Sequence, residues 1–504
     1  MYRTFSADKD TYITDKVIKG VRVTGSNVGD AATLDLFKLY GATLSGTTPN
    51  IELSRILIHF DIDKIKQLYA EKKIDIEDPN FWCRIHLKDV YGGQPTPANF
   101  NVHVFPLSAS FDEGIGRDVT YYTDRDKSNW ISSSVTTKWF VSGCGGACFS
   151  TGSGDYITSS LSTGSTKVSQ YFKVGTEDLV VDVTKLVSAT VVGELPDSGF
   201  RISFDNAIEA NNRSYFVKRF GSRNAYDETV RPKLTMGFDD SVRDDTQNLT
   251  FDSSCRLSLY NFFSGEQKNI VSGSGLTEVK GNNCILLKLS TSSSNGVYEL
   301  IATGSQLALG SGNWCYVSGA YFADFVLPSN NPIIKSNLLA SSSVKFTPIW
   351  SSLDGTVGYV TGSVVTAHPP VRSAARPTSN YYVNVKEVKS DYSHEEETQF
   401  RVEIFDRNTP FVKVVKVPVE LPGKVLKNVH YQVRNAVTNE VVLPFDLTRM
   451  STKVSSDSEG MFFNFDMSSL TPNSTYVFDV LIDVNGIKKA HHNVSPVFTV
   501  TDGT

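Results

Sequence analysis

The chain has 504 residues, of which 40% are hydrophobic, 20% charged and 11% aromatic. This composition excludes a disordered chain and predicts roughly three or four globular domains of about 100–200 residues each. The formal net charge of −5 argues against a nucleic-acid partner, which would require clustered Lys and Arg.

The first predicted domain covers residues 1–240. Alternating apolar residues predict strands at 54–61, 81–87 and 101–105, and a short helix at 62–73. Residues 111–139 are predicted to form a long loop with short strands. Alternation returns at 179–187, 199–204 and 231–238, which we expect to be half-buried strands.

Two further domains follow a charged segment, 239–248, that we expect to be a linker. Residues 241–370 predict a middle β-sandwich domain, which ends in a proline-rich spacer at 368–377. Residues 381–504 predict an immunoglobulin-like sandwich without the Cys…Trp…Cys pattern, with strands at 382–388, 399–405 and 475–484. The fold class is therefore all-β and multidomain.

No segment approaches the ~18 consecutive apolar residues of a membrane-spanning helix, so we expect no membrane insertion. The first eight residues lack the apolar run of a secretion signal, which predicts synthesis in a cytoplasm.

Residue types that bind metals occur in three patterns: a cysteine pair, three histidines and an acidic loop. Each pattern also has an explanation that needs no metal. Cys144 and Cys148 form a C-x3-C pair without a second pair, which favours two idle thiols over a zinc site; a disulfide is a third alternative. The side chains of His59, His86 and His103 would bind zinc only if their three strands were neighbours, so we favour boundary positions. We predict no metal site.

An acidic loop offers Ca²⁺ as the one cofactor alternative. Asp112, Glu113 and Asp118 are separated by glycines, and Asp8 and Asp10 near the first strand could add ligands. The spacing matches no defined calcium loop, so we favour a solvated turn.

Four aromatic residues lie in one polar region: Tyr121, Tyr122, Trp130 and Trp139. Exposed rings would form a platform for a glycan or for a partner protein. Large aromatic side chains equally fill β-sandwich cores, and we favour packing or contact between subunits over sugar binding.

No catalytic residues are identified. The sequence has neither a G-x-S-x-G nucleophile elbow nor a Walker-type phosphate loop, and its carboxylates form no recognisable glycosidase pair. We therefore predict that the protein is not an enzyme.

An ordered series of short motifs in residues 1–240 resembles the DNRLRE-type domain, a jelly-roll sandwich related to carbohydrate-binding modules. The motifs that carry this resemblance are residues 7–13 (ADKDTYI), 56–61 (ILIHFD), 111–116 (FDEGIG) with Trp130, 182–187 (DVTKLV), 222–223 (SR) and 231–234 (RPKL). Long insertions and the missing secretion signal depart from that family's usual pattern.

The whole chain is similar to uncharacterised structural proteins of tailed bacteriophages. This resemblance implies a virion protein that assembles in the host cytoplasm, in several copies, with other virion proteins as partners. We expect a place on the tail, neck or collar rather than as a capsid decoration. The alternative is an adhesin that binds glycan of the host envelope.

Overall fold

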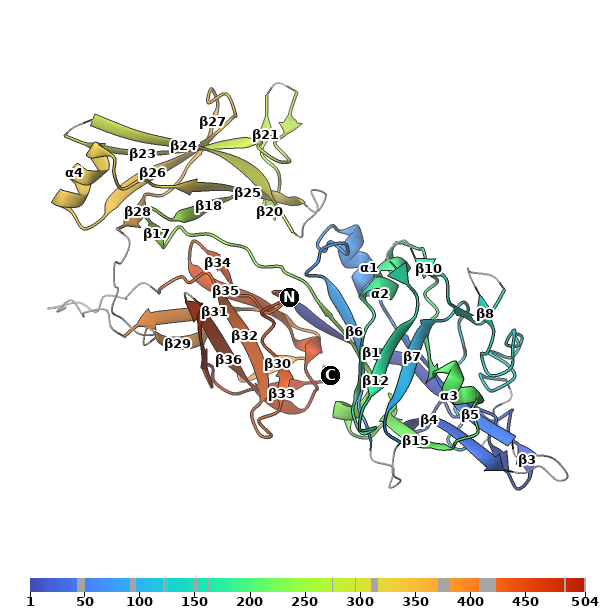
Figure 1. Ribbon diagram of the computed structural model, residues 1–504. Coiled ribbons are helices and arrows are strands. Elements are labelled where there is room, and N and C mark those ends of the chain that lie inside the picture. Colours follow the sequence, from blue (N-terminus) through green and yellow to red (C-terminus); the bar gives the residue numbers. More distant parts are fainter. Residues whose placement is uncertain are drawn as a thin grey trace. The chain divides into compact units, whose positions relative to one another are not determined.

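The computed structural model describes residues 1–42, 50–90, 97–120, 124, 126–148, 153–161, 164–273, 275–294, 296–309, 316–369, 381–407, 423–484 and 486–502. Its contacts divide the chain into two units. The N-terminal unit consists of Arg3–Tyr69 and Phe81–Gly237; the second unit consists of Met1–Tyr2, Ala70–Asn80 and Phe238–Thr504. In both units the regular secondary structure of the described residues is mostly β-strand (Figure 1). The helices of the described ranges are all too short or too polar to cross a membrane.

The N-terminal unit is a β-sandwich whose main sheet has ten strands, in the order β12-β7-β14-β5-β1-β16-β6-β13, with β4 joining β5 to β15. These strands are β1 (Tyr2–Thr14), β4 (Thr33–Ala42), β5 (Asn50–Phe60), β6 (Trp82–Leu87), β7 (Phe100–Pro106), β12 (Val168–Phe172), β13 (Leu179–Asp182), β14 (Phe200–Phe204), β15 (Tyr215–Gly221) and β16 (Lys233–Gly237). Short ladders are β2 (Val17–Ile18) with β3 (Val21–Arg22), β8 (Ala147–Cys148) with β9 (Tyr156–Ile157), and β10 (Ser160–Leu161) with β11 (Gly164–Ser165).

The strand β5 is buried on both faces, which explains its nearly continuous apolar sequence. Ile56 and Ile58 lie on one face, and Leu57 lies on the other with Ile13 of β1. That second face is covered by the irregular segment predicted as a loop, because Phe111, Trp130 and Trp139 pack against Leu57 and Ile13. Side chains of the segment 111–139 therefore cover this face of the sheet.

The helix α1 (Asp63–Ala70) confirms the helix expected after β5, with Ile65 and Leu68 buried. The strand expected at 179–187 is half wrong, because β13 ends at Asp182 and α2 (Thr184–Val191) begins. The carboxylate of Asp182 accepts from the backbone N–H of Thr184 at 3.1 Å, while the N-cap position of α2 is Val183. Val183, Leu186 and Val187 are buried at helical spacing. A third helix, α3 (Asn206–Ala210), follows β14.

The second unit begins with the middle domain, residues 249–369, whose main sheet has eight strands in the order β17-β28-β26-β23-β24-β25-β18, with β27 beside β26. These are β17 (Leu249–Thr250), β18 (Ser254–Tyr260), β23 (Ile285–Ser293), β24 (Gly296–Ala308), β25 (Tyr316–Val326), β26 (Val344–Ser351), β27 (Gly358–Thr361) and β28 (Val365–His368). Two hairpins, β19 (Phe262–Phe263) with β20 (Glu266–Gln267) and β21 (Val271–Ser272) with β22 (Thr277–Glu278), and the helix α4 (Pro332–Ala340) complete it.

The C-terminal domain is the expected immunoglobulin-like sandwich. A sheet β29-β31-β35-β34 faces a sheet β30-β38-β36-β32-β33, in which β37 pairs with β36 (Figure 1). The strands are β29 (Tyr381–Lys386), β30 (Asp391–Ser393), β31 (Glu397–Asp406), β32 (Val429–Asn435), β33 (Val441–Leu443), β34 (Ser455–Asp457), β35 (Gly460–Asp466), β36 (Ser474–Val484), β37 (Ile487–His491) and β38 (Phe498–Thr501). Short 3-10 turns lie at Glu228–Val230 and Met467–Ser469.

An aromatic cluster fills this sandwich. The ring of Phe478 lies 4.9 Å from that of Phe400 and 5.0 Å from that of Phe498. The Tyr476 hydroxyl donates to the carbonyl of Thr471, five residues upstream, at 2.7 Å. This tyrosine corner at the start of a strand is typical of immunoglobulin-like sandwiches and fixes the turn before β36.

The segment 239–248 is packed rather than a solvated linker. Asp244 and Asp245 are buried, and the backbone N–H of Asp244 donates to Ser456 Oγ at 3.0 Å. A sequence does not distinguish buried charged residues that accept hydrogen bonds from the backbone from exposed ones, and for this reason the segment was expected to be a linker. Of the spacer 368–377, only His368 and Pro369 fall within the described residues; the rest lies outside them.

Candidate functional site

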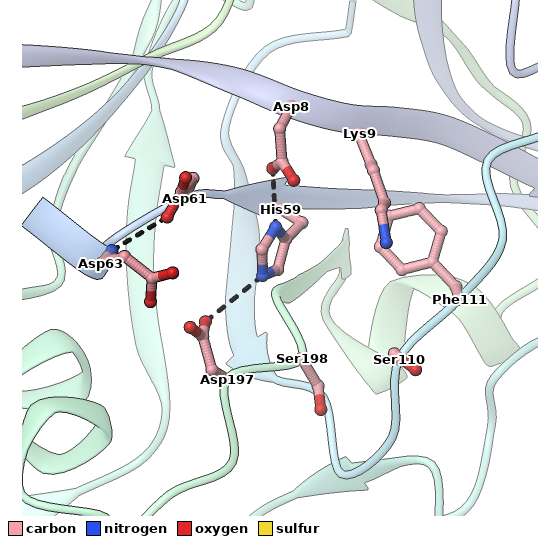
Figure 2. A pocket seen from close by; sticks show the side chains of 9 residues that line it. All are labelled: Asp8, Lys9, His59, Asp61, Asp63, Ser110, Phe111, Asp197 and Ser198. Atoms are coloured by element: carbon pink, nitrogen blue, oxygen red, sulfur yellow. Dashed lines mark hydrogen bonds and ion pairs between the residues drawn. The ribbon is translucent and has the colours of Figure 1, made fainter.

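A pocket of about 320 Å³ in the N-terminal unit gathers polar side chains from segments far apart in the sequence (Figure 2). Its lining residues are Asp8, Lys9, His59, Asp61, Asp63, Ser110, Phe111, Asp197 and Ser198. At its centre, the imidazole of His59 lies between two carboxylates. Nδ1 lies 2.6 Å from Asp8, and Nε2 lies 3.3 Å from Asp197.

Two backbone features place these carboxylates. The register of β1 against β5 shifts between Ala7, which pairs with Phe60, and Lys9, which pairs with His59, so Asp8 is the extra residue of a β-bulge. A bulge redirects the side chain of its extra residue, here toward the pocket. Asp197 lies two residues before Gly199, where φ is +91° and a Cβ would lie 2.4 Å from the Ile58 carbonyl oxygen, so only glycine fits.

The charged side chains of the pocket form one network of ion pairs. Hydrogen bonds that His59 donates to Asp197 and Asp8 raise the pKa of His59 to about 9, although burial opposes the shift. Burial raises the pKa values of Asp8 and Asp197, but the hydrogen bonds and the charge of His59, joined at Asp197 by those of Lys66, together outweigh it, and both pKa values are lowered. Lys66 Nζ extends the chain of charges, 2.6 Å from Asp197 and 2.9 Å from Asp63.

This geometry suits binding better than proton transfer. A general base must present a neutral nitrogen to the proton that it abstracts. Both nitrogens of His59 are occupied by carboxylates, and a pKa near 9 keeps the ring charged at neutral pH. The carboxylates of Asp61 and Asp63 at the rim can accept hydrogen bonds from a small polar ligand.

The other two histidines considered for zinc have partners of their own. His86 Nε2 lies 2.8 Å from the Thr235 hydroxyl, and burial lowers the pKa of His86 to about 4. His103 Nε2 lies 3.0 Å from Asp205. Within the described ranges, no three His, Cys, Asp or Glu side chains are grouped to hold a metal ion. The structure therefore does not bring His59, His86 and His103 together.

The carboxylates of the acidic loop form ion pairs and a backbone hydrogen bond within the protein. Glu113 forms a two-pronged ion pair with Arg223, with both N–O distances at 2.6 Å. Asp112 faces Lys127 at 3.8 Å, and Asp118 accepts from the backbone N–H of Thr120 at 2.5 Å. The three carboxylates thus have separate partners, and at Glu113 the turn is packed rather than solvated.

Asp10 joins the Glu113–Arg223 pair and is separate from Asp8. Its backbone N–H donates to Glu113 at 2.8 Å, and its carboxylate accepts from the backbone N–H of Arg223 at 2.6 Å. Burial raises the pKa of Asp10 to about 7. The motifs at 7–13, 111–116 and 222–223 are therefore in contact.

Trp130 and Trp139 are buried, 8% and 7% exposed, so they present no ring face to a sugar. Trp139 Nε1 donates to the Asn129 carbonyl at 2.7 Å, and the Arg55 guanidinium lies 5.3 Å from the Trp130 ring. Both residues therefore fit the alternative in which these aromatic side chains pack inside the domain. Tyr121 and Tyr122 lie outside the described residues.

Cys144 is buried in the same cluster as Trp130 and Trp139, and Cys148 is buried in β8. Burial raises the pKa of Cys144 to about 12, so its thiol stays protonated. The thiol of Cys148 donates to the Tyr156 carbonyl at 3.3 Å.

Sequence reasoning missed the pocket. It singled out His59 and Asp8 only for metal binding, and it did not single out Asp197. A polar Asp-Ser-Gly turn directly before a buried strand was the available signal at residues 197–199. Joining it to His59 requires the antiparallel pairing of β14 with β5, which a single sequence does not reveal.

No family model and no curated protein matches the chain. Among solved structures, it is similar to the FN1–FN3 domains of chicken CNTN1, with 9% identity over 65% of this chain and 82% of that one, at a TM-score of 0.17. It is also similar to the native conformation of E. coli alpha-2-macroglobulin, with 8% identity over 99% of this chain and 24% of that one, at a TM-score of 0.13. The chain thus spans about a quarter of the macroglobulin's length. Similarities this low carry no argument about function.

Proposed function

We propose that the chain is a non-enzymatic structural component of a tailed-phage virion, present in several copies on the particle. A tail, neck or collar position is preferred over capsid decoration. The phage assignment comes from the resemblance described above. The assembly role has its own support in the surface of the middle domain.

That support is a concentration of large apolar side chains left in solvent. The exposed apolar residues of the middle domain are Phe262, Phe263, Val271, Leu276, Val297, Ile301, Val326, Leu339, Leu353, Val357 and Val364. Single exposed apolar residues are ordinary, but eleven of them in this one domain give it apolar area that a partner protein can cover. In a particle built by symmetry, each such contact is repeated in every copy.

The test is the protein content of purified particles. Quantitative mass spectrometry of gradient-purified virions should find the chain at a fixed copy number, constant between preparations and unchanged by high-salt washing. Detection in infected-cell lysate but never in particles would refute the proposal.

A glycan-binding adhesin is the second candidate, and the pocket around His59 is the observation that favours it. Its carboxylates and the hydroxyls of Ser110 and Ser198 are groups that can bond sugar hydroxyls. Titration calorimetry with host polysaccharide separates the two functions. Saturable binding that is lost in an Asp61→Asn/Asp63→Asn variant would favour the adhesin.

A further inference from the structure

We propose that the side chains of Lys218 and Asp89 join in a covalent amide bond, with loss of one water molecule. The bond links β15 to the segment that follows β6 in the N-terminal unit. The inference goes beyond the proposed function and does not depend on it.

The two side chains are already in contact in the interior. Lys218 Nζ donates to Asp89 Oδ1 at 2.5 Å and to the carbonyl of Glu177 at 2.7 Å. The side chain of Lys218 has no exposed surface, and that of Asp89 is 15% exposed. In the ion pair of Lys66 with Asp197, by comparison, the lysine side chain is 35% exposed. The pair of Lys218 with Asp89 is therefore shielded from the water that surrounds an ordinary ion pair.

The backbone holds the two residues opposite each other. Asp89 forms an antiparallel β-bridge with Phe220, and the N–H of Val90 donates to the carbonyl of Arg219 at 2.9 Å. Lys218 lies two residues before Phe220 in β15, so its side chain is on the same face of the strand. The reacting groups are thus brought together by folding, and groups held in this way react as if at very high concentration.

The surroundings of the amine are apolar. The rings of Phe172 and Phe220 are fully buried, and each ring centre lies 5.2 Å from Lys218 Nζ. Burial lowers the pKa of Lys218, although the hydrogen bond to Asp89 and the neighbouring carboxylates oppose the shift. The neutral amine, which is the nucleophilic form, is therefore more accessible than at an exposed lysine.

The reaction needs no further reactant. The ammonium group first passes a proton to the carboxylate along their hydrogen bond, which leaves an amine and a carboxylic acid. The lone pair of Lys218 Nζ then attacks Cγ of Asp89 and forms the N–C bond. The C–OH bond breaks, and the hydroxyl leaves as water with a proton from the nitrogen. No electron is transferred, and the neutral amide replaces two charges in the interior, where charges are costly.

The bond would cross-link positions 129 residues apart in the sequence. A cross-link of this span removes chain entropy from the unfolded state, as a disulfide does. We therefore expect the N-terminal unit to unfold about 10 °C higher with the bond than without it.

Mass spectrometry of the purified full chain under denaturing conditions tests the bond. The wild type should be lighter than its sequence mass by one water molecule. Trypsin should release a branched peptide that joins the segments around Lys218 and Asp89. The variants Lys218→Arg and Asp89→Ala should each have their full sequence mass and lack the branched peptide. Lys66→Arg, in the exposed pair with Asp197, is the matched control and should show both signs of the bond.

The wild-type mass and peptide map decide the outcome even if a variant fails to fold. A wild type at its full sequence mass would overturn the proposal. Loss of water without the branched peptide would also overturn it, because a cyclic imide at a single aspartate loses water but joins no two peptides. The copy number in particles is a separate measurement, so this proposal and the proposed function can fail independently.

Discussion

At the residue scale, His59 should make stability depend on alkaline pH. Its folded pKa of about 9 lies above the ordinary value of 6.5. A raised pKa gives a stabilisation that is complete below about pH 6.5 and is lost as the pH rises through about 9. Allowing for its partial exposure, we expect the free energy of unfolding to fall by about 1–2 kcal/mol over that window, measured by urea denaturation.

The His59→Gln variant serves as the control because it has no proton to lose. Its stability should fall less than that of the wild type over the same window, by about the His59 contribution, since Asp10 and Cys144 still titrate in both proteins. Asp8→Asn should move the His59 titration toward 6.5. The titration is followed by the Cε1 proton resonance in NMR spectra. A wild-type midpoint near 6.5 would contradict the network seen around the pocket.

At the element scale, the turn before β14 should depend on Gly199. Gly199→Ala would place a Cβ 2.4 Å from the Ile58 carbonyl oxygen, so the turn must shift and carry Asp197 away from His59. We expect a loss of about 2–4 kcal/mol in unfolding free energy and a fall in the His59 pKa.

Gly193→Ala is the matched control for that variant. Gly193 also has a positive φ, +80°, but nothing lies within 4 Å of its Cβ position. Gly193→Ala should lower the free energy of unfolding by only about 1 kcal/mol, because alanine is strained in the left-handed backbone conformation. It should leave the His59 titration unchanged. Equal effects of the two variants would show that backbone strain, not the close approach to Ile58, matters at Gly199.

Most elements were predictable where one physical signal dominates. The alternation in β6, β29 and β31 follows from one buried face, and the sequence predicted these strands within two residues. At residues 183–187, apolar side chains fit both a strand and a helix; in the structure Val183, Leu186 and Val187 are buried at helical spacing. The pocket was out of reach because a bulge at Asp8 and a pairing between distant strands create it.

At the scale of the whole molecule, each sandwich encloses a core of its own. Phe478 and its ring partners fill the C-terminal domain, and β5 carries the centre of the N-terminal unit. Because domains with separate cores need not unfold together, calorimetry should resolve more than one transition.

Substitutions in the two cores should therefore act on different transitions. Phe478 is fully buried and stacks with Phe498, so Phe478→Ala should lower the stability of the C-terminal domain by about 3–5 kcal/mol. Ile56→Ala in β5 should lower that of the N-terminal unit by about 2–5 kcal/mol. In differential scanning calorimetry each variant should shift one transition and leave the other within about 1 °C, since separate cores are independent. If both transitions move together in either variant, the units are coupled and the chain unfolds as one body.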